Sequence, residues 1–257
     1  MKATSTRRLE GLALGAAMAL ALAACAGDAD QPTGSAEGPG VTPAAGTTEP
    51  PATEPASPGE RSFVLSVPGD GPTITVTLPG PEWDTIGPGI LVRDGNADPP
   101  DGAALIAPYF GELWVYGDPC QWGSTLPDAP ATTVDQFVTA VTAQASRNGS
   151  APMDTTVDGH AGKSMTIHVP DDTVFAEGLD DPFTECDLGT FASWAGGGEP
   201  VSAGPSRWQQ GPGQIDELWI LDVDGELVVI DAMYGAQTPQ AHLAEINAIL
   251  DSMTFDE

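Results

Sequence analysis

The sequence predicts an α+β fold in which an antiparallel sheet is covered by two main helices, after a disordered N-terminal tether. Short apolar runs separated by turn residues begin at Arg61, and such runs are typical of strands. Two longer segments, after Thr133 and after Thr238, place apolar residues at helical spacing. The strands occur in runs rather than in strict alternation with helices, which favours an antiparallel sheet.

The first strands are expected to form a hairpin. Residues 63–67 and 74–78 are apolar and β-branched, and a Pro-Gly-Asp-Gly-Pro turn at 68–72 separates them. Three further strand candidates follow at 90–92, 104–106 and 113–116.

The first helix is predicted from a capping box. Thr133 is followed three residues later by Gln136, a pair that satisfies the free N–H groups at a helix start. The helix is expected to run to about Arg147 with one apolar face, formed by Phe137, Val138, Val141 and Ala145.

The C-terminal part predicts a second hairpin and a second helix. After shorter strand candidates at 164–169 and 191–194, two apolar runs at 218–223 and 227–234 flank Asp-Gly, which is a type I′ turn signal. Thr238 then provides an N-cap and Pro239 a first-turn proline. The apolar stripe of this helix consists of Leu243, Ile246, Ile249, Leu250 and Met253.

Residues 1–24 have the composition of an export signal. A basic start precedes residues 11–24, which contain only Gly, Ala, Leu and Met. This run is shorter than the roughly 20 residues that a membrane-spanning helix needs. The four residues that end in Cys25 resemble the bacterial lipobox, which implies diacylglycerol on the Cys25 sulfur. The alternative is an ordinary signal peptide with an accidental cysteine.

The chain after the signal is expected to have two parts. Residues 25–60 begin with the lipidated cysteine and are rich in Pro, Thr, Ala and Gly, with too few large apolar side chains for a core, so we expect a disordered linker. Residues 61–257 have the length of a single domain. We therefore expect a domain held on the extracytoplasmic face of the cell membrane by acyl chains.

The strongly acidic composition excludes one class of partner. Removal of residues 1–24 takes the formal charge from −29 to −31 and leaves five strong cations. Such a surface cannot neutralise phosphates, so we expect no nucleic-acid binding. It also repels anionic headgroups, so no membrane contact is expected beyond the anchor. Acidity is compatible with a basic partner, although solubility alone is the simpler interpretation.

Cysteine usage predicts one disulfide. If Cys25 is lipidated, Cys120 and Cys186 are left as a pair in an oxidising compartment. The alternative, that both bind a metal, is disfavoured because no CxxC spacing or neighbouring histidine is present.

Several loose motifs resemble extracytoplasmic actinobacterial proteins. The opening hairpin, Pro-Gly-Pro-Glu-Trp at 79–83 and the closing hairpin and helix are similar to the Mog1/PsbP-like fold of LpqN-type lipoproteins. The segments 118–122 and 209–234 look like a group of uncharacterised proteins from the same bacteria. The resemblance implies an anchored α+β domain and supplies no catalytic residues.

No catalytic signature stands out. Gly162-Lys163-Ser164 lacks the first glycine of a P-loop and leads into a strand. A serine hydrolase would need a serine placed by the fold beside a histidine, and the three histidines, His160, His168 and His242, are more typical of surface positions. No cofactor is therefore expected, and the one alternative is a bound calcium ion. Asp94, Asn96 and Asp98 alternate oxygen side chains as a calcium loop does, but without its glycine and closing glutamate.

Tryptophans suggest where a ligand would bind. Trp208 and Gln209 lie in a Gly/Pro-rich stretch, and Trp122 lies beside Cys120, so these three are candidates for an exposed recognition surface. For Trp122 we favour the alternative, packing on the disulfide. The expected function is a noncatalytic binding module for an envelope protein or glycan, and the rival hypothesis is a hydrolase whose site forms only in three dimensions.

Overall fold

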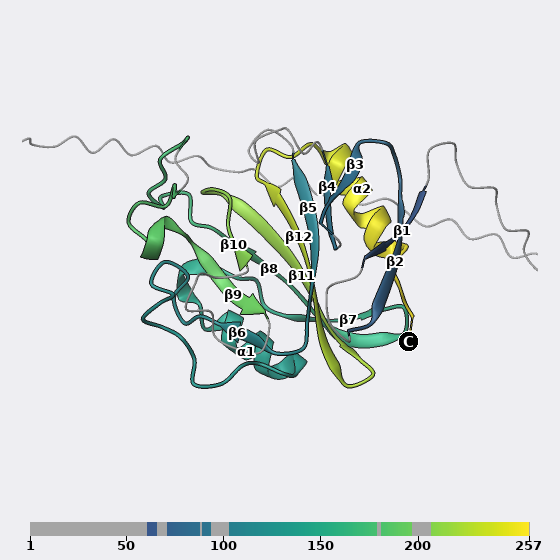
Figure 1. The fold of residues 1–257 in the computed structure, drawn as a ribbon, viewed down its shortest axis with the longest axis horizontal. Helices are drawn as coiled ribbons and strands as arrows, with labels where there is room; N and C mark the ends of the chain where they lie inside the picture. Colours follow the sequence, from purple (N-terminus) through teal and green to yellow (C-terminus); the bar gives the residue numbers. More distant parts are fainter. Residues whose placement is uncertain are drawn as a thin grey trace, which may run out of the picture. The chain divides into compact units, whose positions relative to one another are not determined.

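A computed structural model describes residues 61–65, 71–87, 89–93, 103–178, 181–196 and 207–256. These residues all belong to one compact unit, Glu54–Glu257. They are mostly β, with 43% in strands, 16% in helices and three antiparallel sheets (Figure 1). The expected α+β class with one sheet is therefore wrong. Several strands of two to five residues were overlooked because so short a run has no measurable period.

The largest sheet has seven strands in the order β3-β4-β5-β12-β11-β8-β7. At its centre lies the hairpin of β11 and β12, whose turn residues Asp224 and Gly225 have φ angles of 54° and 92°. Positive φ at both positions is the type I′ geometry, so the predicted hairpin is confirmed. In sheet order the strands are β3 (Trp83–Ile86), β4 (Ile90–Arg93), β5 (Ala104–Phe110), β12 (Glu226–Gly235), β11 (Gln214–Val223), β8 (His160–His168) and β7 (Met153–Val157).

Two three-stranded sheets accompany the central one. The first consists of β1 (Arg61–Leu65), β2 (Thr73–Leu78) and β13 (Thr254–Asp256). In it β1 pairs with β2 as the sequence predicts, and residues 66–70, which include part of the predicted turn, lie outside the described part of the chain. The second consists of β10 (Arg207–Trp208), β9 (Ala192–Gly196) and β6 (Leu113–Val115).

The central sheet is buried on both faces. Val228 and Ile230 of β12 pack in a core with β1, β2 and the helix α2 (Gln240–Asp251). Leu227 and Val229, which point the other way, pack in a second core with β6, β9 and the helix α1 (Val134–Thr142). Figure 1 shows α1 and α2 on opposite sides of this hairpin. Burial of both faces explains why β12 reads as a continuous apolar run.

Helix α1 is shorter than predicted. The Thr133 hydroxyl caps it by accepting a hydrogen bond from the Gln136 N–H at 3.3 Å, but the Gln136 side chain accepts from Thr132 instead of closing the box. The helix ends at Thr142 because Gln144 leaves the helical conformation and donates its side-chain amide to the carbonyls of Tyr116 and Ser193. A 3₁₀ turn, η2 (Ala145–Arg147), follows and carries the chain inward.

Helix α2 begins two residues later than Thr238. Its N-cap is Pro239, and the Thr238 hydroxyl accepts from the Gly235 N–H at 3.1 Å, so the predicted threonine cap is wrong. The predicted apolar stripe is confirmed, since Ile246, Ile249, Leu250 and Met253 are all buried in the first core. Among the described residues no helix has both the length and the apolar character to cross a membrane.

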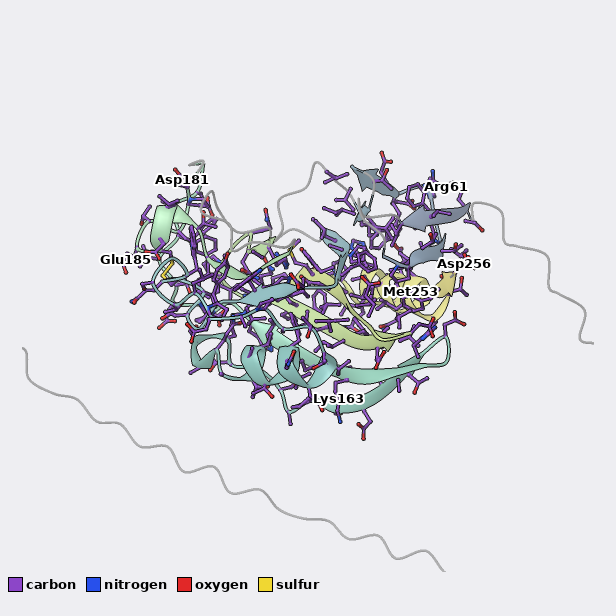
Figure 2. The ribbon with its side chains drawn as sticks, turned by 60° about the horizontal axis from the view of Figure 1, so that its bottom comes forward. Arg61, Lys163, Asp181, Glu185, Met253 and Asp256 are labelled. Atoms are coloured by element: carbon purple, nitrogen blue, oxygen red, sulfur yellow. A yellow bond between two sulfur atoms is a disulfide. The ribbon has the colours of Figure 1, made fainter. Side chains whose placement is uncertain are left out.

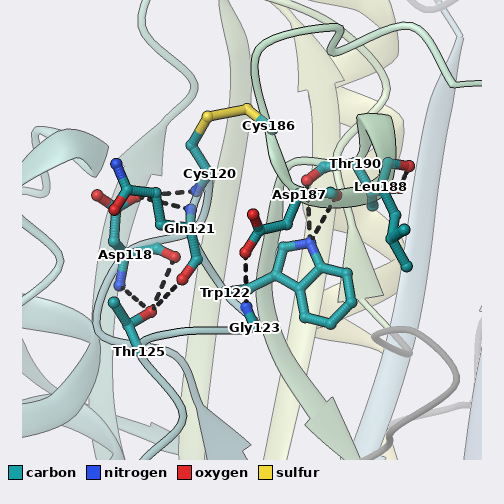
Figure 3. Close-up of a disulfide and its surroundings, with 10 residues drawn as sticks. All are labelled: Asp118, Cys120, Gln121, Trp122, Gly123, Thr125, Cys186, Asp187, Leu188 and Thr190. Carbon is teal, nitrogen blue, oxygen red and sulfur yellow. Dashed lines mark hydrogen bonds between the residues drawn. A yellow bond between two sulfur atoms is a disulfide. The ribbon is translucent and has the colours of Figure 1, made fainter.

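The predicted disulfide is confirmed. Cys120 and Cys186 are joined, and the two loops that carry them are also bonded to each other (Figure 3). The Asp187 N–H donates to the Cys120 carbonyl at 2.8 Å, and the Asp187 carboxylate accepts from the Gly123 N–H at 2.9 Å. A second 3₁₀ turn, η3 (Asp187–Gly189), lies in this loop. The disulfide therefore joins two loops that are also held together by hydrogen bonds.

Loss of this disulfide is expected to destabilise the fold. The bond closes a loop of 66 residues, and the chain-entropy estimate for that length is about 4 kcal/mol. For the double variant Cys120→Ser/Cys186→Ser we predict a melting temperature lower by about 10 °C. Thermal unfolding followed by circular dichroism measures it, with reduced wild-type protein as the control. A decrease of less than about 2 °C would contradict the prediction.

Candidate functional site

A buried ion-pair network lies between the central sheet and the β6–β9–β10 sheet. Arg207 of β10 donates through Nε to Asp231 of β12, and through Nη2 to Asp216 of β11 at 2.7 Å. Arg147 of η2 donates to the second carboxylate oxygen of Asp216. These four side chains are at most 4% exposed. Each arginine is paired with a carboxylate, and such pairing is what allows charged side chains to be buried together.

The strand period places both carboxylates on the core side of the sheet. Asp216 shares a face of β11 with Leu218, and Asp231 shares a face of β12 with Val229. Side chains two residues apart point the same way, so these aspartates occupy positions that otherwise carry core residues. A single buried charge costs several kcal/mol unless it is paired, so the two arginines are required partners.

Amide and aromatic groups complete the surroundings of Asp216. The side-chain amide of Gln214 donates to its Oδ1 at 2.5 Å, and that of Gln209 donates to its Oδ2 at 3.2 Å. The guanidinium of Arg147 lies 5.6 Å from the Phe191 ring centroid, within reach of a cation–π contact. Asp216 is thus the common acceptor for side chains from three segments of the chain.

The charge states of the two aspartates differ. Burial opposes ionisation of Asp216, but the positive charges of Arg207 and Arg147 outweigh it and hold its pKa below the usual value. Burial raises the pKa of Asp231 to about 7, with the charge of Asp216 adding to the shift and Arg207 opposing it. Asp231 is therefore the member of the network that titrates near neutral pH.

The network is structural in character. Perturbed pKa values indicate a functional site when the groups line a cleft, but Asp216 and Asp231 are both 0% exposed. A substrate cannot reach a carboxylate that has no exposed surface. What the network can do is fix the geometry of the surface next to it.

A groove of about 970 Å³ opens beside the network at one end of β11 and β12. Three segments form it: the loop after β8, the turn before β11 and the residues at the end of β12. Its lining residues are Asp171, Thr173, Phe175, Glu177, Gly178, Gln210, Gly211, Pro212, Gly213, Gln214, Gly235, Ala236 and Gln237.

Gln214 joins the groove to the network. It lines the groove, is only 3% exposed, and accepts from the Gln210 N–H at 2.6 Å while donating to Asp216. Gly213 beside it has φ of 72°, and a Cβ there would lie 2.9 Å from the carboxylate of Asp171. A larger residue at 213 would be strained and would displace that carboxylate from the groove.

The opposite wall is connected to the same network through aromatic rings. Phe175 of the lining stacks edge-on against Phe183 at 5.1 Å, and Phe183 contacts Phe191 at 5.6 Å. Phe191 lies under Arg147, which binds Asp216. Phe175 on one side of the groove is therefore connected, through these rings and the buried network, to Gln214 on another side. A surface held in this way loses little conformational entropy when it binds.

The structure buries two of the three candidate recognition residues. Trp122 is 6% exposed, contacts the Tyr116 ring at 5.8 Å and donates its indole N–H to the Asp187 carbonyl at 3.0 Å (Figure 3). It belongs to a buried cluster with Tyr116, Ala192 and Ala195, whereas Cys186 and Cys120 belong to another, so packing on the disulfide stays a prediction. Gln209 is 2% exposed and belongs to the ion-pair network. The side chain of Trp208 lies outside the described residues.

The other candidate sites are not described or are not assembled. Cys25 and the calcium candidates Asp94, Asn96 and Asp98 lie outside the described residues. Within the described part of the chain there is no group of three or more His, Cys, Asp or Glu that could hold a metal ion. Of the three histidines, His160 stacks against the Phe255 ring at 5.2 Å.

Comparison with known protein families, with curated proteins and with solved structures found no match to this chain. The sequence analysis did not predict a role for Arg147, Asp216, Arg207 or Asp231. Asp216 and Asp231 each occupy a position in a strand where the alternation calls for an apolar residue, and this departure from the pattern could have indicated them.

The raised pKa of Asp231 predicts a pH-dependent stability. Between its ordinary value of 3.8 and about 7 the folded protein holds a proton that the unfolded chain releases. The free energy of unfolding should therefore fall as pH rises through this window. Asp231→Asn removes the titration and should flatten the fall.

Urea unfolding of the purified chain at several pH values between 4 and 8 measures this difference. Asp224→Asn, at the exposed hairpin turn, is the control and should keep the wild-type slope. Equal slopes for wild type and Asp231→Asn would show that Asp231 ionises normally in the folded protein.

Proposed function

We propose that the chain is a lipid-anchored lipoprotein of the extracytoplasmic face of the cell membrane that binds a ligand without catalysis. The observation that carries the binding role is the groove, whose floor and wall are both fixed by the network around Asp216. The groove lies within the 300–1,000 Å³ range of ligand pockets. Its occupant belongs to the cell envelope, either a protein or a glycan.

The anchor part of the proposal rests on the sequence. Cys25 follows a basic and apolar leader and stands at the end of a lipobox-like tetrapeptide. The Pro-rich linker up to residue 60 has a reach of at most about 100 Å when extended. We include kinship to the actinobacterial lipoproteins in this proposal, without the α+β fold that the resemblance implied.

Binding is favoured over hydrolysis by the chemistry of the lining. The described lining residues contain carboxylates, amides, one threonine and one phenylalanine, but no histidine, cysteine or serine. A nucleophilic hydrolase needs a nucleophile next to a general base that a third group orients. Hydrogen-bonding groups around a partly aromatic groove are typical of recognition.

The anchor predicts a change of location on substitution of one residue. Cys25→Ser removes the only sulfur in the lipobox-like segment, so the exported chain should be found in the medium instead of the membrane fraction. Immunoblotting of both fractions measures it. Cys25 lies outside the described residues of the domain. Thermal unfolding of the released protein is the control that shows that its domain is folded. Continued sedimentation of Cys25→Ser with membranes, even when Ala236→Trp also fills the groove, would refute the lipid anchor.

The groove predicts retention on isolated envelopes. The released Cys25→Ser protein should bind envelopes, and Ala236→Trp, which fills the groove from an exposed lining position, should reduce the bound fraction at least about fivefold, roughly 1 kcal/mol. Ala161→Trp is the matched control, because Ala161 is exposed at the far end of β8. Equal loss in both variants would indicate nonspecific adsorption and would count against the groove.

A further inference from the structure

We propose that the ligand of the groove is a peptide segment carrying lysine or arginine, supplied by another protein of the envelope. This inference rests on the proposed binding function and adds the chemistry of the ligand. It is carried by the charge of the lining, the location of the chain's own cations and the aromatic wall.

The described lining residues are acidic and include no cation. Asp171 and Glu177 are both exposed, one on each side of Phe175 in the sequence, and no lysine, arginine or histidine occurs among the lining residues that the structure describes. Two carboxylates along one wall attract a cationic side chain, and the overall charge of −29 strengthens the attraction at long range.

The chain's own cations are engaged elsewhere. Beyond residue 60 the five lysine and arginine residues are all described. Arg147 and Arg207 are buried in the network, Arg93 binds Glu245 at 2.6 Å, Lys163 binds Asp154 at 2.5 Å, and Arg61 donates to the Trp83 carbonyl at 2.6 Å. Figure 2 shows Arg61 and Lys163 well away from the loop of Asp181 and Glu185.

The aromatic wall and the amides suit a peptide. Phe175 is only partly buried, and Phe183 holds its ring, so its free face can contact a cation or the methylene stem of a lysine. Gln210 and Gln237 are exposed lining residues. Side-chain amides both donate and accept hydrogen bonds, as a peptide backbone does. An anionic ligand would be repelled by the same lining.

Binding of defined probes to the released Cys25→Ser chain tests the inference. The probe is a short fluorescent peptide that alternates lysine with alanine. Its matched control replaces lysine with glutamate, and a neutral N-acetylglucosamine oligomer represents the glycan alternative. We expect the lysine peptide to bind, and its affinity to fall at least about tenfold between about 0.05 M and about 0.5 M salt, because screening shortens the reach of exposed charges.

Substitution of the two acidic lining residues locates the effect. The double variant Asp171→Asn/Glu177→Gln should weaken lysine-peptide binding at least about tenfold, because each substitution removes a negative charge at the contact. The matched control is Asp224→Asn with Glu226→Gln, which removes the same charge about 30 Å away at the other end of the β11–β12 hairpin. It should change the affinity less than about twofold. Equal melting temperatures would show that both proteins remain folded.

The outcomes separate this inference from the proposed function. Equal binding of the lysine and glutamate peptides, or equal effects of the two double variants, would overturn the basic-peptide inference. Binding of the sugar alone, blocked by Ala236→Trp, would overturn it and leave the groove as a binding site. If no probe binds and Ala236→Trp does not alter retention on envelopes, both proposals are wrong.

Discussion

The carboxylate of Asp216 is the point on which the arrangement of this domain depends. It is fully buried, and it accepts hydrogen bonds from Arg147, Arg207, Gln209 and Gln214. Loss of one charged partner would leave an uncompensated charge in the core, a change that typically costs 3–5 kcal/mol. Every segment that supplies a partner is therefore held in one position relative to β11.

This requirement accounts for local features that propensity alone does not. Helix α1 stops at Thr142 and η2 follows, which brings Arg147 to Asp216. Strand β10 is only two residues long, yet Arg207 within it reaches both Asp216 and Asp231. The same constraint fixes Gln214, so the groove floor has the rigidity of the core although it borders solvent.

The sequence predicted what neighbouring residues determine. The type I′ turn at Asp224 and Gly225, the Thr133 cap and the stripe of α2 are local patterns, and each was recognised. The single disulfide followed from cysteine number and compartment. Pairing over long distances was not accessible, because Arg147 and Asp216 are 69 residues apart and no local pattern joins them. The groove was missed for the same reason, since its three walls come from separate segments.

The scarcity of cations connects the interior of the protein with its surface. Of its eight lysine and arginine residues, three lie in residues 1–24 and two neutralise buried aspartates. The core thus uses much of the positive charge that the folded part possesses, and the solvent-facing side chains are left strongly anionic. Charge of that sign repels anionic headgroups and attracts basic groups. In the lipoprotein proposed above, a domain of this charge would be held near the membrane by the Cys25 anchor alone, and its acidic groove would meet the proposed basic partner.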